Sequence, residues 1–413
     1  MNRAPLGTAR TAIATSRIAR GTARAAVGTA CAAALALAAV PSAHATAPTR
    51  GEVVSTTRIA SMSKARTAEY LAKMNFGSPK PKYGVEVYRV VYRTVAVNGR
   101  PTTASGLVVL PRGKDRRLRT VVYEHGTNPT KKAAATVNAG SYDRAGSILF
   151  AGAGFGTVAP DYLGLGLGPG RHPYMDHASE TSASLDMLRA AEKVAARHGR
   201  TLDRRVRVTG FSQGGAAATA LGRALQAKGR LAALAPVSGP YDVEHAEVPE
   251  GLHGTSLDPR EVTFYLGYWL TSMNRLHHLY ASPSEAFQQP YSATVETLFD
   301  GHHTPAEIVT GLPATPQELL TPAFIKRFDH PTGGLARALR QNDGTCRSWT
   351  PRVPVRVYAA RGDKDVTIRN AQNCVRALRA HGVAAPLIDV GDTDHNGSAF
   401  RSIPQIVTWF SSL

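Results

Sequence analysis

The feature that most restricts the fold of this 413-residue chain is a serine between glycines, in the segment VRVTGFSQGGAAATA. A β-branched run, Val206–Thr209, precedes this Ser212, and an alanine-rich run follows it. The pattern predicts a strand, a sharp turn and a helix, with Ser212 in the turn. Only a residue without a side chain fits two positions to either side of such a turn, which accounts for Gly210 and Gly214.

The rest of the chain alternates between short apolar runs and helical patterns. The apolar runs lie at 120–123, 154–158, 206–208, 231–237, 353–358 and 387–390. Before them, VEVYRVVYRTVAV and TTASGLVVL flank Asn98-Gly99, which predicts a β-hairpin. A helix is predicted over 61–75. This order predicts an α/β fold with a mostly parallel central sheet that is flanked by helices.

The alternation stops between residues 241 and 350, a stretch rich in proline, histidine and aromatic side chains such as Tyr265 and Trp269. We interpret it as a mainly helical cap or lid inserted between two strands of the core. The core would then comprise 46–240 and 351–413. A second domain without a catalytic role is the alternative.

The first 45 residues differ from the rest, with five arginines, no acidic residue and an apolar run that ends near Ala43-His44-Ala45. This composition is typical of a secretory signal peptide that is cleaved after Ala45. The alternative, a membrane anchor, is disfavoured because the run is alanine-rich and shorter than the ~20 residues that a spanning helix needs. We therefore expect a secreted, extracellular protein that does not span a membrane.

The formal net charge of +19 bears on what the protein associates with and not on which reaction it catalyses. The chain has no long Lys/Arg run and no aromatic stacking pattern, so we expect no nucleic-acid partner. The pairs His277-His278 and His302-His303 lack the i, i+4 spacing of a helical zinc motif. We expect no metal and no cofactor.

Two cysteines, Cys346 and Cys374, remain outside the predicted signal peptide. In an exported protein such a pair most simply forms one disulfide bond, and two free buried thiols are the alternative. The bond would join the end of the predicted insertion to the helix that follows the next strand.

If Ser212 is a nucleophile, it needs a base and an orienting carboxylate, in the chain order Ser, Asp, His. A capping serine would also suit the start of a helix, but capping does not require glycine on both sides. After the strand VPVRVYAA, Asp365 fits the expected acid position best by spacing. Asp363 is its rival, with a turn role as its other explanation. His395, in the loop GDTDHNG after the last predicted strand, is the candidate base.

Hydrolytic acyl transfer also needs N–H donors for the oxygen that becomes negative. The turn His125-Gly126-Thr127 follows the strand TVVYE and would direct the Thr127 N–H toward Ser212. The Gln213 N–H would be the second donor of this oxyanion hole. An ordinary turn at the end of a strand is the alternative.

Together these residues resemble the α/β-hydrolase superfamily over roughly residues 83–413. YEHGT, APDYLGLG, GFSQGG, the long insertion and GDTDHNG are similar to the secretory lipase family of the lipase A type. The resemblance implies a cap between the sixth and seventh conventional strands and hydrolysis of carboxylic esters. Carried over by motif, Ser212 would be the nucleophile, Asp365 the acid and His395 the base.

The expected function is thus a secreted esterase or lipase that forms an acyl-enzyme, with a small ester or lipid as substrate. We expect a monomer, in at most transient contact with a lipid interface. An exported serine peptidase or aminopeptidase is the alternative enzyme, since fold does not fix substrate. An acidic cluster in the cap, with Glu244, Glu247 and Glu250 as candidates, would favour it. A catalytically silent binding protein is the third alternative.

Overall fold

A single mixed sheet forms the centre of the protein. The computed structural model describes residues 49–413, so the predicted signal peptide at 1–45 lies outside the described residues. The sheet has nine strands in the order β1-β2-β3-β5-β4-β6-β7-β8-β9. The strands are β1 (Val53–Met62), β2 (Val85–Val95), β3 (Pro101–Pro111), β4 (Arg117–Glu124), β5 (Gly156–Pro160), β6 (Thr201–Phe211), β7 (Leu231–Val237), β8 (Val357–Ala359) and β9 (Leu387–Asp389).

The sheet is antiparallel at its N-terminal edge and parallel elsewhere. β1, β2, β3 and β5 pair antiparallel in turn, whereas β5, β4, β6, β7, β8 and β9 are parallel neighbours. The predicted hairpin joins β2 and β3, with Gly99 at a φ of +77°, a conformation that glycine adopts at low cost. The mostly parallel arrangement is confirmed.

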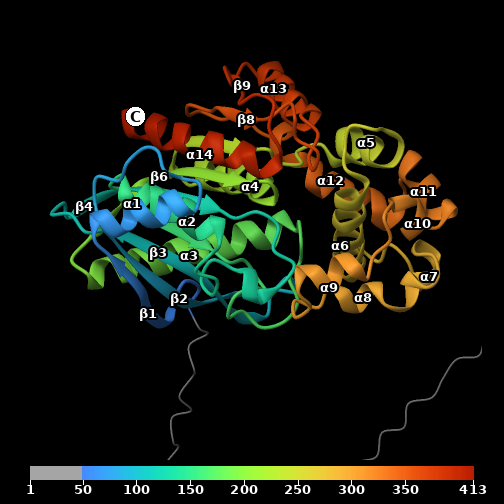
Figure 1. The fold of residues 1–413 in the computed structure, drawn as a ribbon, viewed down its shortest axis with the longest axis horizontal. Coiled ribbons are helices and arrows are strands. Elements are labelled where there is room, and N and C mark those ends of the chain that lie inside the picture. The colour runs from blue at the N-terminus through green and yellow to red at the C-terminus, as the bar shows by residue number, and fades with distance from the viewer. Residues whose placement is uncertain (1–48) are drawn as a thin grey trace, which may run out of the picture. The chain divides into compact units, whose positions relative to one another are not determined.

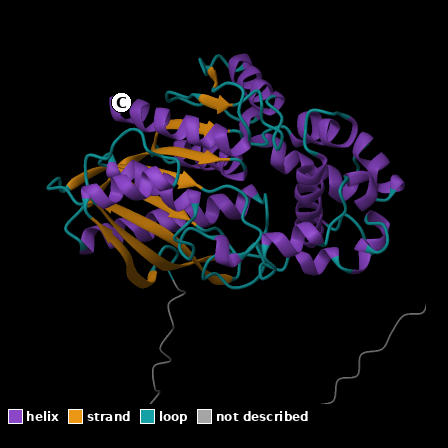
Figure 2. Ribbon diagram, in the orientation of Figure 1, coloured by secondary structure: helices purple, strands orange, loops and turns teal. Residues whose placement is uncertain are grey.

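Helices cover both faces of this sheet (Figures 1 and 2). On one face α3 (His177–Arg197), α4 (Gln213–Ala227) and α13 (Arg369–Ala380) contribute to one apolar core. On the other face α1 (Lys64–Lys73), α2 (Tyr142–Gly152) and α14 (His395–Ser412) contribute to a second core. Because both faces of the inner strands are covered, β4, β5 and β7 each contain a short run of buried, mostly apolar residues.

The first strand was not expected from the sequence. Half of residues 53–62 are polar and none of the ten is buried, so their pattern indicated no strand. They nevertheless pair with β2 as the edge of the sheet, where one strand side faces solvent and little apolar burial is needed. The predicted helix at 61–75 therefore begins later, at Lys64, and is capped by the side chain of Ser63.

A group of helices lies between β7 and β8 in the chain. It comprises η2 (Val243–Glu247), α5 (Val248–His253), α6 (Pro259–His277), α7 (Pro283–Ala286), η3 (Tyr291–Ala293), α8 (Val295–Leu298), α9 (Pro305–Thr310), α10 (Pro316–Leu319), α11 (Pro322–Asp329) and α12 (Gly333–Arg347). The group has its own apolar core, and Figure 2 shows it free of strands beside the sheet. The short 3-10 turn η1 (Lys131–Ala133) completes the elements. Between residues 49 and 413, no helix is both long and apolar enough to cross a membrane.

Candidate active site

Ser212 occupies the sharp turn between β6 and α4, as the sequence predicts. Its backbone has φ 59° and ψ −124°, which is unusual for a residue with a side chain. A Cβ atom at Gly210 would lie 2.2 Å from the Gly214 oxygen, and one at Gly214 would lie 2.1 Å from the Glu124 oxygen. The two glycines are thus required by contact with backbone atoms. Close contacts with surrounding backbone atoms hold the turn in this strained conformation. Strained backbone of this kind is common at functional sites.

Three side chains from distant parts of the chain form a hydrogen-bonded series at this turn. The Ser212 Oγ lies 2.8 Å from the His395 Nε2. The His395 Nδ1 lies 2.7 Å from Oδ2 of Asp363. Because a carboxylate only accepts, Nδ1 carries the proton and Nε2 is left to accept from the serine hydroxyl. All three residues are buried.

The expectation that Asp365 is the carboxylate partner of His395 is wrong. Asp363 takes that place, and its Oδ1 also accepts hydrogen bonds from the N–H groups of Asp365 and Val366. The Asp363 side chain therefore both binds backbone N–H groups of its own turn and contacts the imidazole of His395. Asp365 instead accepts a hydrogen bond of 3.0 Å from the Tyr265 hydroxyl of α6.

His395 lies at the first position of α14 rather than in an open loop. Asp394 caps this helix by accepting from the Gly397 N–H. The imidazole ring packs against Phe211, with ring centroids 4.5 Å apart. Helix geometry and packing together hold the ring in its orientation, which a free loop would not do.

The electrostatics of the series favour a charged imidazole. Burial acts to lower the pKa of His395, but the charge and hydrogen bond of Asp363, together with the charges of Asp365 and Glu247, outweigh it, so the pKa is raised above its ordinary value. Burial also raises the pKa of Asp365, while the nearby His395 acts in the opposite direction. The arrangement can hold a positive charge on the imidazole when it receives a proton from Ser212.

The two segments predicted to supply N–H donors meet at Ser212. A Cβ atom at Gly126 would lie 3.6 Å from the Ser212 Cβ, so the turn after β4 passes directly beside the serine. The next residue, Thr127, is held by a 3.0 Å contact between its hydroxyl and that of Tyr174. Gln213 is the first residue of α4, and the first N–H groups of a helix have no acceptor within it.

The side chain of Gln213 points into a buried polar network that the sequence did not indicate. Its Nε2 donates to Oε1 of Glu180 at 2.6 Å and lies 2.9 Å from the His172 Nε2. The other Glu180 oxygen lies 2.7 Å from the His177 Nδ1. These residues stem from α3 and the segment before it, and no spacing rule connects them to Ser212. They fix the residue that follows the serine.

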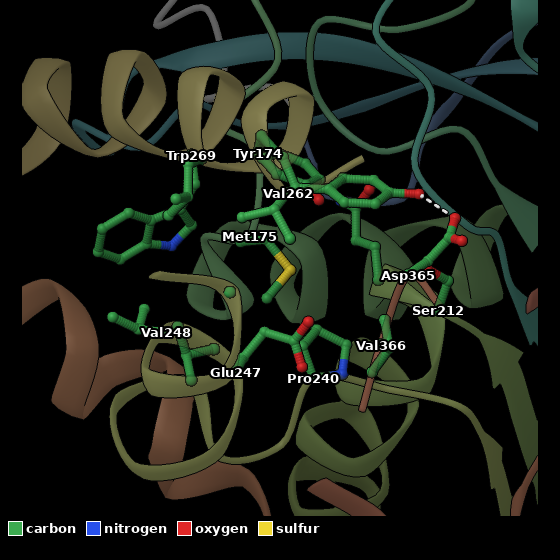
Figure 3. A pocket seen from close by; sticks show the side chains of 15 residues that line it. Tyr174, Met175, Ser212, Pro240, Glu247, Val248, Val262, Trp269, Asp365 and Val366 are labelled. Carbon is green, nitrogen blue, oxygen red and sulfur yellow. Dashed lines mark hydrogen bonds between the residues drawn. The ribbon is translucent and has the colours of Figure 1, made fainter. Parts of the chain in front are cut away.

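A mostly apolar cavity opens from Ser212 into the helical insertion. Its empty space, counted together with the open solvent at its mouth, is about 640 Å³. The core side supplies Ser212 and Asp365, and the insertion supplies apolar side chains such as Val262 and Trp269. Figure 3 shows Ser212 and Asp365 at one end of this group of side chains, and its dashed line marks the hydrogen bond that Asp365 accepts. Glu247, which the sequence marked only as a candidate, contributes a carboxyl group to the wall.

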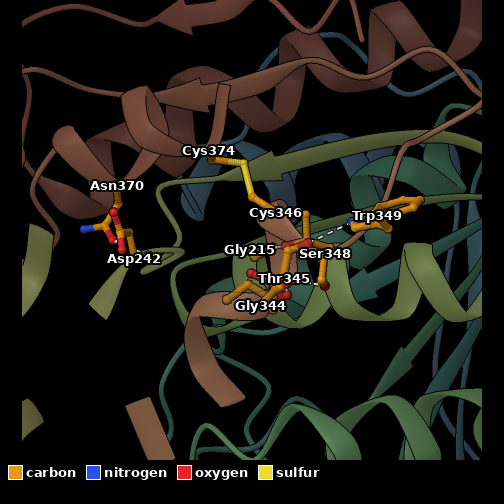
Figure 4. The surroundings of a disulfide bond; sticks show 11 residues. Gly215, Asp242, Gly344, Thr345, Cys346, Ser348, Trp349, Asn370 and Cys374 are labelled. Carbon is orange, nitrogen blue, oxygen red and sulfur yellow. Dashed lines mark hydrogen bonds between the residues drawn. A yellow bond between two sulfur atoms is a disulfide. The ribbon is translucent and has the colours of Figure 1, made fainter. Parts of the chain in front are cut away.

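The insertion is fixed to the core close to the cavity. The predicted disulfide is confirmed: Cys346 of α12 is bonded to Cys374 of α13, with Cα atoms 5.2 Å apart (Figure 4). Asp343, one turn before Cys346, accepts from the N–H groups of Val243 and Glu244 in η2. One covalent bond and two hydrogen bonds thus connect α13, α12 and the cavity wall.

Asp242, His245 and Asp343 are close enough together for a metal ion, the one such group within residues 49–413. The donors already around them argue against that use. Arg347 binds the Asp242 carboxylate, and Asn373 donates to its other oxygen. Asp343 accepts the two backbone bonds described above. These three residues are better explained as part of an ion-paired contact between η2 and α12.

No protein-family model matches the chain, and no curated protein matches it in sequence. Among solved structures, the chain is similar to a Legionella pneumophila protein with a provisional hydrolase assignment (26% identity, TM-score 0.79, covering 87% of this chain and 98% of that one). It is also similar to the rice cell wall degrading esterase LipA from Xanthomonas oryzae (27%, 0.76, 89% and 99%). Candida antarctica lipase A follows at 14% identity and a TM-score of 0.59, with 84% and 78% covered, which concerns the fold alone.

Proposed function

We propose that this protein, an α/β-hydrolase by fold with esterases and lipases among its structural neighbours, is a secreted serine hydrolase of carboxylic esters. Ser212 is the nucleophile, His395 the base and Asp363 the orienting acid. The observation that carries this proposal is the series Ser212 Oγ–His395 Nε2 (2.8 Å) and His395 Nδ1–Asp363 Oδ2 (2.7 Å) at a strained turn. A helix cap needs none of these contacts.

In the first half of the reaction His395 removes the proton of Ser212 as its Oγ attacks the ester carbonyl. The imidazolium, stabilised by Asp363, then protonates the leaving alcohol as the C–O bond breaks, and an acyl-enzyme forms. In the second half a water molecule gives its proton to His395 and attacks the acyl carbon. The acid leaves, and the proton returns to the Ser212 oxygen.

The Thr127 and Gln213 N–H groups are the proposed donors to the tetrahedral intermediate. Their segments both reach Ser212, and the Gln213 side chain is held by Glu180 and His172. Donors held in place before the reaction contribute more than mobile ones, because no reorganisation is needed as charge develops.

The peptidase alternative gains no comparable support. Of its three candidate acids, only Glu247 lines the cavity. Glu250 instead accepts from the N–H groups of Thr255 and Ser256, and Glu244 is not part of the wall. The three candidate acids therefore do not form a cluster at Ser212, where Glu247 and Asp365 are the acidic side chains that line the cavity.

Secretion is part of the proposal because the N-terminal 45 residues have the composition of a signal peptide. The Cys346–Cys374 disulfide is compatible with an oxidising compartment.

The test compares hydrolysis of p-nitrophenyl esters and aminoacyl anilides by the wild type and by Ser212→Ala. We expect ester turnover that falls on the order of 10⁴-fold in the variant, with an unchanged melting temperature. Near-normal ester turnover by the folded variant, or anilides as the better substrates, would contradict the proposal.

A further inference from the structure

Glu247 places a carboxyl group in the wall of the mostly apolar cavity that it shares with Ser212 and Asp365 (Figure 3). It lies at the end of η2, a single π-helical turn. Such turns occur often at functional sites because they redirect a side chain out of helical register. The proposed catalytic steps do not use this residue.

The two oxygens of Glu247 have unequal surroundings. Oε2 accepts from the Thr367 N–H at 3.2 Å and from the Asn370 side-chain amide. Among the partners that residues 49–413 provide, Oε1 has none. Thr367 and Asn370 follow the loop of Asp363 and lie at the N-terminal end of α13, so the carboxyl group is anchored to the core through one oxygen. The other oxygen remains available to an occupant of the cavity.

Glu247 is partly exposed, so its Oε1 can meet water in the empty cavity. A substrate that displaces this water leaves Oε1 without a partner unless it supplies one, and an unpartnered polar atom that is withdrawn from water costs free energy. Burial raises the pKa of the Glu247 carboxyl to about 8, so its neutral form prevails near pH 7. Because Oε2 already accepts two hydrogen bonds, the proton belongs on Oε1. Glu247 therefore offers the cavity a hydrogen-bond donor on the wall that the insertion supplies, apart from the polar side chains of Ser212 and Gln213 on the core side.

The part of an ester that fits this cavity is its acyl chain. The alcohol must leave and water must enter between the two halves of the proposed reaction, so their side needs open access. The acyl group stays attached to Ser212 through both halves. A mostly apolar space beside the serine, lined by side chains such as Val262, Leu266 and Trp269, suits it better than it suits the leaving group.

We propose that Glu247 is a specificity-determining residue that donates a hydrogen bond to an oxygen atom along the substrate's acyl chain, which makes keto- or hydroxy-substituted acids the favoured acyl groups. This inference rests on the proposed function and names the substrate class of the same site.

The experiment measures kcat/KM for p-nitrophenyl octanoate and for its 4-, 5-, 6- and 7-oxo derivatives. The ketone oxygen can only accept a hydrogen bond, so a preference in kcat/KM for an oxo derivative reports on the proposed donor. We expect at least one derivative to exceed octanoate by about 5-fold or more in the wild type, the order of one net hydrogen bond. Glu247→Gln should keep this preference, because its amide can accept through oxygen from Thr367 and Asn370 while its N–H faces the cavity. Glu247→Met should bring the ratio close to one.

Glu244→Met is the matched control, since Glu244 belongs to the same turn but does not line the cavity. It should keep the wild-type ratio, and melting temperatures should show that each variant is folded. The inference is overturned if the wild type prefers no oxo position, if Glu247→Met keeps the preference, or if an ω-amino chain is preferred instead.

A binding measurement distinguishes a failure of this inference from a failure of the proposed function. Calorimetry with the Ser212→Ala protein and methyl esters of the same acids should show tighter binding of the favoured oxo ester, and loss of that difference when Glu247→Met is added. If no ester is turned over but this binding difference exists, the proposed function fails and the inference stands. If esters are turned over by Ser212 and the difference is absent, only the inference fails.

Discussion

At the scale of single residues, the sequence spacing could not identify which of Asp363 and Asp365 contacts His395. Asp363 and Asp365 are two residues apart at the end of the same strand, and both carboxylates are close enough to influence His395. The outcome depends on the turn itself. Asp363 binds the N–H groups of Asp365 and Val366 with one oxygen and therefore directs the other toward the imidazole.

Asparagine substitutions distinguish the two aspartates. Asp363→Asn should lower kcat by about 10⁴-fold, because the amide no longer stabilises the imidazolium or its tautomer. Asp365→Asn should cost at least two orders of magnitude less, since it removes a charge that makes no hydrogen bond to the imidazole, and its amide oxygen can still accept from the Tyr265 hydroxyl. Steady-state kinetics on one p-nitrophenyl ester measures both. Equal losses, or a larger loss for Asp365→Asn, would restore Asp365 as the acid.

The pH dependence follows from the raised pKa of His395. The base must be neutral to accept the serine proton, so kcat/KM should rise with pH as His395 loses its proton. The midpoint should lie above the ordinary histidine value of 6.5 because Asp363 favours the charged ring despite burial. The residual activity of Asp363→Asn should have a lower midpoint, since the charge of Asp363, the largest of the raising causes, is removed while those of Asp365 and Glu247 remain. An acid limb below 6.5 in the wild type would contradict this.

At the scale of elements, the turn between β6 and α4 is the part of the fold that the sequence predicts most directly. The strand, the turn and the helix were predicted from GFSQG and its flanks, since the glycines leave few other conformations. The helical position of His395 was not, because GDTDHNG has the composition of a loop and the cap is supplied by Asp394. The edge strand β1 was missed because its pairing with β2, rather than its own side chains, forms it.

Alanine substitution tests the turn. Gly210→Ala places a Cβ atom 2.2 Å from a backbone oxygen, so we expect a loss of about 1–3 kcal/mol in the free energy of unfolding, together with loss of ester turnover. Gly344→Ala in α12 is the control. Its Cβ atom would meet only a side-chain oxygen at 3.7 Å, and alanine there should stabilise the helix by about 0.5–1 kcal/mol. Urea denaturation compares them, and a neutral Gly210→Ala would argue against the tight turn.

At the scale of the whole molecule, the layered sheet was predictable and the interior of the insertion was not. Buried strands and amphipathic helices leave periodic patterns, whereas the insertion consists of short helices whose apolar contacts are irregular along the chain. Glu247 was only one of three acidic candidates for that reason. Its position depends on η2, Thr367 and Asn370 together.

The disulfide belongs to this scale because it joins the insertion to the core. The cysteines are 28 residues apart, and the chain-entropy model assigns such a link about 3–4 kcal/mol. The double variant Cys346→Ala/Cys374→Ala should lose a comparable part of the free energy of unfolding in urea. The same loss should follow from reduction of the wild type. Two free thiols in the untreated protein, found by mass spectrometry, would contradict the bond.

Labelling with a fluorophosphonate tests the central claim most directly, because the reagent reacts with a serine only when a base and an oxyanion site activate it. Peptide mapping of the labelled wild type should find the phosphonyl group on Ser212, and His395→Ala should lose the label while remaining folded. A folded wild type that is not labelled, or that is labelled at another serine, would contradict the account.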